Sequence, residues 1–104
     1  MIDNKITNLK YPWLRKIDNG ILIEILVMTE CSKTRIMGSQ NERLLIQLEC
    51  SLITTSIDKT LINFLADVFD IPTVQISIVA SSGKDKKTVS IDQISTANAI
   101  IKLS

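Results

Sequence analysis

Histidine is absent from the 104-residue chain, and aromatic residues make up only 4% of it. Without an imidazole to shuttle protons near neutral pH, Ser-His-Asp and Cys-His catalysis are excluded. Lysine and arginine number 12 against 11 acidic residues, which gives a formal net charge of +1. This balance excludes a strongly basic nucleic-acid or membrane binder, so any anion site must be local.

Long apolar runs and export signals are also missing. The longest apolar run, residues 21–28, is interrupted by Glu24 and falls far short of the roughly 20 residues that a membrane helix needs. The N-terminus lacks the basic region, apolar stretch and cleavage site of a signal peptide. We therefore expect a cytoplasmic protein with no membrane association, in which Cys31 and Cys50 stay reduced.

The chain is apolar enough to fold, because hydrophobic residues make up 45% of it. Its length suits one compact domain. Residues 1–19 mix charges without a sustained period, and we interpret them as an N-terminal arm anchored by Tyr11 and Trp13. Residues 20–104 are interpreted as a single domain.

Two kinds of apolar spacing predict the elements of this domain. Alternation predicts strands over residues 21–28, 43–49, 74–80 and 87–91, with Gly83 at the turn between the last two.

Helical spacing predicts a helix over residues 57–69, begun by the capping pair Thr55 and Asp58 and ended by Pro72. A last helix should follow an Asp92 cap and pack through Ile94, Ala97, Ile100 and Ile101.

The predicted order is ββαββα, which indicates an α+β two-layer sandwich. Two hairpins would form one four-stranded sheet, and both helices would cover its apolar face. The other face would stay mostly open to water.

Several segments agree in order and spacing with one known family. Residues 27–38 read VMTECSKTRIMG, which resembles the pattern V-x-P-x-[AS]-[SK]-[RK]-x-x-[IV]-x-G. The later segments LINFLA, IP, ISIV and KTVSI follow in the same register. On these segments the chain resembles the YggU-like family of small bacterial proteins, a family without a settled activity. The resemblance implies a mixed sheet with two helices on one side and an intracellular, monomeric domain.

The chain departs from the family at its most polar motifs. Residues 51–58 stand in the place of the family's Gly-Lys-Ala-Asn stretch, and they lack its glycine and its lysine. Aligned without gaps, the family's Ser-Gly-x-x-Ser-Arg-x-Lys becomes residues 80–87, which keep only the final lysine in place, whereas a shifted alignment would keep Ser82 and Gly83. Because the family arginine is absent, any family site is altered or lost here.

A flexible, lysine-rich turn provides the candidate site. Its backbone N-H groups and ammonium groups suit a phosphate, and the hydroxyls that precede the first helix suit an anion as well. The ordinary alternative is a solvated hairpin turn, since Asp85 reduces the local charge. Convergence of the turn, the first loop and the helix start is implied by the family fold. The candidate anion-binding residues are Lys33, Arg35, Thr55, Ser56, Ser82, Gly83, Lys84, Lys86 and Lys87.

We expect a non-enzymatic binding module for RNA or another phosphate-bearing anion, with no cofactor and no metal. Gly83-Lys84 lacks the upstream glycine and the following Ser or Thr of a phosphate-binding loop, and Cys31 has no partner for catalysis. The alternative is a protein-interaction module that uses an open sheet edge or the exposed side of residues 22–28.

Overall fold

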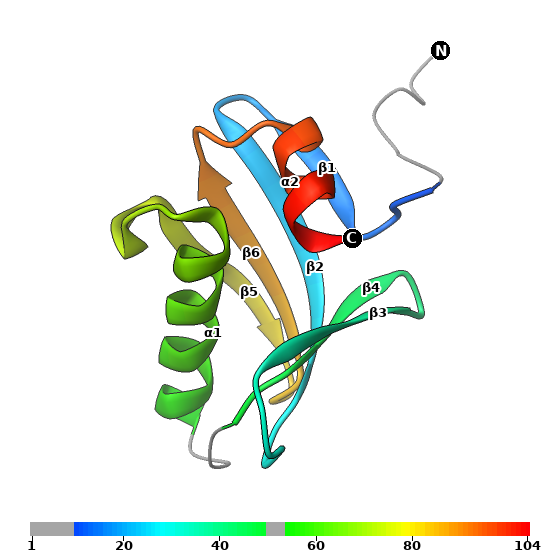
Figure 1. Cartoon of the computed structure of the whole chain (residues 1–104), viewed down its shortest axis with the longest axis vertical. Helices are drawn as coiled ribbons and strands as arrows, with labels where there is room; N and C mark the ends of the chain where they lie inside the picture. Colours follow the sequence, from blue (N-terminus) through cyan, green and yellow to red (C-terminus); the bar gives the residue numbers. More distant parts are fainter. Residues whose placement is uncertain (1–9, 50–53) are drawn as a thin grey trace.

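A six-stranded mixed sheet carries two helices on one of its faces (Figure 1). The computed structural model describes residues 10–49 and 54–104 and the side chains of all of these except residues 54–56. The elements, in chain order, are β1 (Leu14–Ile17), β2 (Gly20–Met28), β3 (Arg35–Gln40), β4 (Arg43–Gln47), α1 (Thr54–Phe69), η2 (Thr73–Gln75), β5 (Ile76–Ser82), β6 (Lys86–Asp92) and α2 (Thr96–Leu103).

Strand β2 lies at the centre and organises the sheet, whose order is β3-β4-β2-β6-β5. Along one edge it pairs antiparallel with β6 from Gly20 to Leu26. Along the other edge it has two successive partners: antiparallel β1 at residues 20–23, then parallel β4 at residues 25–28. The partner therefore changes at Glu24, in the middle of the strand.

The core lies between the sheet and the helices. Along β2, Ile21, Ile23, Ile25 and Val27 are buried, whereas the alternate residues stay partly exposed. Fully buried Leu61 and Leu65 of α1 complete this layer. Each such side chain contributes about 1.5–3 kcal/mol on burial, so alternation along β2 holds both helices on one face and leaves the other face open.

Helix α1 confirms the first predicted helix, with a different start. It begins at Thr54, so Thr55 lies inside the first turn and the prediction of Thr55 as its N-cap is wrong. Its end has two capping bonds, from Ile71 N-H to Ala66 O (3.0 Å) and from Asp70 N-H to Asp67 O (3.3 Å), with Asp70 at φ 57°. These bonds form a Schellman motif, and Pro72 follows it as predicted.

Helix α2 begins later than predicted. Ser95 is its N-cap and accepts a hydrogen bond from Asn98 N-H (3.0 Å), whereas Asp92 is the last residue of β6. The buried residues of this helix are Ala99 and Leu103. Ala97 and Ile101, which were predicted to pack, are exposed, Ile101 at 76%.

The α+β class is confirmed, but the predicted ββαββα order and four-stranded sheet are wrong in detail. The observed order has two additional strands, β1 and β3. Strand β1 lies within the segment interpreted as an arm, where buried Trp13 and Leu14 fix it to the core. Strand β3 is an edge strand with little burial, so it leaves no alternating apolar pattern in the sequence.

Within the described ranges, neither helix combines the length and the apolar character needed to cross a membrane.

Candidate functional site on the open face of the sheet

The face of the sheet that the helices leave open carries cationic side chains from four strands. Arg15 is paired with Leu22, and Lys86 with Leu26, so both share the outward side of β2. Arg35 is paired with Gln47, one residue beyond buried Ile46, which places it on the same face. The strand cations of this open face are Arg15, Arg35, Arg43 and Lys86, and its strand carboxylates are Glu24 and Asp92.

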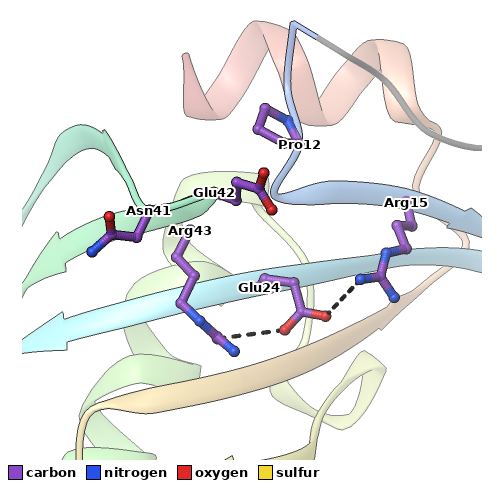
Figure 2. Close-up of a pocket in the computed structure, with 6 residues that line it drawn as sticks. All are labelled: Pro12, Arg15, Glu24, Asn41, Glu42 and Arg43. Carbon is purple, nitrogen blue, oxygen red and sulfur yellow. Dashed lines mark ion pairs between the residues drawn. The ribbon is translucent and has the colours of Figure 1, made fainter.

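Glu24 is the polar centre of this face (Figure 2). Its Oε2 atom lies 3.3 Å from Arg15 Nη2, and its Oε1 atom lies 3.4 Å from Arg43 Nη1. Thr88 donates its hydroxyl to the same Oε1 atom at 2.8 Å. With its side chain 16% exposed, Glu24 is held by neighbours on three strands and positions both guanidinium groups.

This cluster forms because β2 changes partners here. The Glu24 N-H donates to Trp13 O (2.8 Å), just before β1 begins. The Arg43 guanidinium donates to the Ile25 carbonyl (3.2 Å), just where β4 begins. The starts of two strands therefore meet at one residue, and Arg43 bridges the junction.

A cavity of about 250 Å³ opens at this junction. Its floor is the Glu24 cluster, and one wall is the tight turn between β3 and β4, where Asn41 and Glu42 have φ values of 52° and 63°. The positive φ values at two central residues are those of a type I′ hairpin turn. The lining residues are Pro12, Arg15, Glu24, Asn41, Glu42 and Arg43 (Figure 2).

Part of the anion site predicted from sequence is brought together at one end of the sheet. The Val27 N-H donates to Asp85 O (2.7 Å), which holds the β5–β6 turn with Gly83 and exposed Lys84 beside β2. Gln47 donates to Lys33 O (3.3 Å), which holds the first loop beside β4.

On the open face, Ser82 lies opposite Lys86 on the neighbouring strand. Arg35 and Lys86 are three strand spacings apart, which is roughly 14 Å measured across the sheet.

Lys87 lies on the other side of the sheet. Its side chain is 1% exposed, and its Nζ atom is 2.9 Å from Asp58 Oδ1 and 3.3 Å from Ser81 Oγ. The Asp58 Oδ1 atom is buried and forms an ion pair with the Lys87 ammonium group, but the geometry of the contact is not that of a hydrogen bond. Lys87 is therefore occupied within the core, away from Lys84 and Lys86.

Three predictions fall on residues whose side chains the structure does not describe. Thr55 and Ser56 are in the first turn of α1, but their side chains lie outside the described part, and so does Cys50. Cys31 is half-buried, with Sγ 3.5 Å from Thr29 O. Among the residues that are described, no three His, Cys, Asp or Glu side chains gather closely enough to hold a metal.

Sequence reasoning missed the central cluster of Arg15, Glu24 and Arg43. These residues belong to three separate strands, and the parallel pairing of β2 with β4 that aligns two of them is a long-range feature. The one local signal was Glu24 itself, a carboxylate inside an apolar run.

No protein-family model matches this chain, and its resemblance to the YggU-like family therefore stays a prediction.

Proposed function

We propose that this protein is a non-enzymatic binding module that holds the phosphate backbone of RNA on the open face of its sheet. The observation that carries the proposal is that four different strands place cationic side chains on the one face without helices, and that two of these, Arg35 and Lys86, form no ion pair with a described residue. Lys33 and Lys84 extend this set at the end of the sheet.

The charges are distributed in a way that favours a local anion site. The whole chain carries a formal charge of only +1, yet the open-face strand positions hold four cations against two carboxylates. One carboxylate, Asp92, is at the far end of β6 from Lys86. Since arginine and lysine donate directly to phosphate oxygens, a polymer with regularly spaced phosphates suits cations spread over several strands.

The positions of the aromatic residues favour binding through phosphate contacts over binding through bases stacked on aromatic rings. Trp13 is buried, and Tyr11 packs edge-on against it with ring centroids 5.8 Å apart. Phe64 and Phe69 belong to α1, in the other layer. A face without aromatic platforms binds nucleic acid through its charges, so the affinity should depend steeply on salt.

The alternative function, in which a partner protein adds a strand to an open sheet edge, has less support because both outer strands are irregular. Outer strand β3 shifts register between Ile36 and Gly38, and outer strand β5 shifts between Ile78 and Ala80. Such bulges interrupt the hydrogen-bond ladder that an added strand would extend, and they are a usual protection against edge pairing. We therefore favour the face over the edges as the binding surface.

The test is fluorescence anisotropy of a labelled, unstructured single-stranded RNA across a range of salt concentrations. We expect the double substitution Arg35→Gln and Lys86→Gln to weaken binding, and to reduce the slope of log K against log salt by about 1.4, at roughly 0.7 for each phosphate that is no longer neutralised. Lys59→Gln, at an exposed position of α1, is the matched control and should leave the slope nearly unchanged. Binding that is insensitive to salt, or equally weakened by Lys59→Gln, would reject the proposal.

A further inference from the structure

The cavity at the β1–β4 junction differs in charge from the rest of the open face. Two guanidinium groups, from Arg15 and Arg43, line it together with two carboxylates, from Glu24 and Glu42. Glu24 and Glu42 offset the charges of Arg15 and Arg43 in the cavity, so the attraction for a phosphate is weaker there than at Arg35 and Lys86. The cavity is therefore suited to a neutral polar group that both donates and accepts hydrogen bonds.

Both arginines keep donors for such a group. Each guanidinium carries five N-H groups. Arg15 uses Nη2 toward Glu24, and Arg43 uses Nη1 toward Glu24 and the Ile25 carbonyl. Because Glu24 fixes the two guanidinium groups, their other N-H groups are ordered in advance for a ligand.

Glu42 supplies an acceptor at the rim of the cavity. Its residue is exposed, and no ion pair links its carboxylate to any residue in the described part of the chain. Its φ of 63° is in the left-handed region, in a turn type that favours glycine at this position. A glutamate there costs roughly 1 kcal/mol of backbone strain relative to glycine, and it keeps a carboxylate beside the two arginines.

We propose that this cavity holds an unpaired guanine of the bound RNA. The proposal rests on the RNA-binding function proposed above and gives it a base preference. Guanine accepts through O6 and N7, the pair of atoms that arginine recognises, and it donates through its N1-H and N2-H₂ groups, which suit a carboxylate. Adenine lacks the O6 acceptor and the N2 donor, so the same residues fit it less well.

The direct test titrates the 104-residue chain separately with GMP, AMP and ribose 5-phosphate and follows the amide shifts by two-dimensional NMR. GMP should shift the amides of Asn41, Glu42 and Arg43 and bind at least about fivefold more tightly than AMP, since one good base contact discriminates by roughly 1–3 kcal/mol. Ribose 5-phosphate should leave these amides in place. Equal shifts by ribose 5-phosphate, or equal affinities for GMP and AMP, would overturn the proposal.

A matched pair of variants tests the role assigned to Glu42. Glu42→Gln should lower the ratio of GMP to AMP affinity, whereas Glu30→Gln, at another exposed acid with positive φ, should leave the ratio unchanged. An unchanged ratio in Glu42→Gln would reject that role.

The two proposals fail in different ways. Salt-dependent RNA binding that is weakened in the Arg35 and Lys86 double variant, with no GMP shifts at the cavity, would reject the guanine site alone. Guanine-selective shifts without salt-dependent RNA binding would reject the proposed RNA function, and would leave the cavity as a site for free guanine nucleotides.

Discussion

The Nζ atom of Lys87 lies 2.9 Å from the Oδ1 atom of Asp58, which joins β6 to α1 through the core. Lys87 is 1% exposed, whereas the Asp58 side chain is 37% exposed. Besides Asp58, the hydroxyl of Ser81 is within hydrogen-bond distance of the ammonium, at 3.3 Å. The pair therefore places one charge fully inside the protein and its partner at the margin of the core.

Removing Asp58 should cost more stability than removing the charge of Lys87. Asp58→Ala leaves an uncompensated ammonium in the core, and we expect a loss of about 2 kcal/mol, below the usual 3–5 kcal/mol because the site is partly open to water. Lys87→Met keeps most of the side-chain volume without the charge and should cost less. Urea unfolding of both variants measures the two free energies, and a larger loss for Lys87→Met would contradict this explanation.

Gly20 is required for the close approach of β2 and β6. A Cβ atom at this position would lie 2.0 Å from Ile91 O and 3.0 Å from Asp92 Cα, both backbone atoms that cannot move aside easily. We expect Gly20→Ala to lower the free energy of unfolding by about 3 kcal/mol. Gly83→Ala is the comparison, because its Cβ would meet only an Asp85 side-chain oxygen at 3.4 Å and the strain of its φ of 68° should cost about 1 kcal/mol. If thermal or urea unfolding shows the same loss of stability for Gly20→Ala and Gly83→Ala, the predicted clash at Gly20 would be contradicted.

Glu42 should show opposite effects on stability and on binding. Glu42→Gly relieves the strain at φ 63° and should raise the free energy of unfolding by about 0.5–1 kcal/mol. The same variant removes the carboxylate proposed to contact guanine, so it should reduce the preference for GMP over AMP. Chemical unfolding combined with nucleotide titration measures both quantities. A variant that is less stable than the parent protein would show that the turn needs the glutamate for its fold.

Strand β1 should be an integral part of the domain. Leu14 is 2% exposed within the core, and Leu14→Ala should lower the free energy of unfolding by about 2–4 kcal/mol, because apolar burial is reduced and a cavity is left behind. Lys16→Ala, at an exposed position of the same strand, should change it by less than about 0.5 kcal/mol. A loss below about 1 kcal/mol for Leu14→Ala would mean that β1 adds little to the stability of the domain.

The elements with strong local signals could be predicted from the sequence. Alternation along β2, the apolar spacing of α1 and the turn at Gly83 depend on neighbouring residues, and all three are confirmed. Strand β1 has a short, charged sequence, and its place in the sheet depends on pairing with β2 and on the burial of Trp13. Nothing local in residues 14–17 indicates that pairing.

The site was harder to predict because strand pairing decides which face each residue occupies. Lys86 and Lys87 are adjacent in sequence, yet successive side chains of a strand point to opposite faces, so one is exposed and the other is buried. Arg15 and Arg43 come together only at the point where β2 changes partners. Local spacing identified the lysine-rich turn, but for the cluster it showed only Glu24 inside an apolar run and neither of its arginine partners.

The decisive measurement is the salt dependence of RNA binding for the parent protein, the Arg35 and Lys86 double variant and Lys59→Gln. We expect affinity to fall steeply with salt in the parent and in Lys59→Gln, and the slope to be shallower in the double variant alone. A common slope for all three proteins, or no salt dependence in the parent, would contradict the assignment of the open face as the RNA-binding surface.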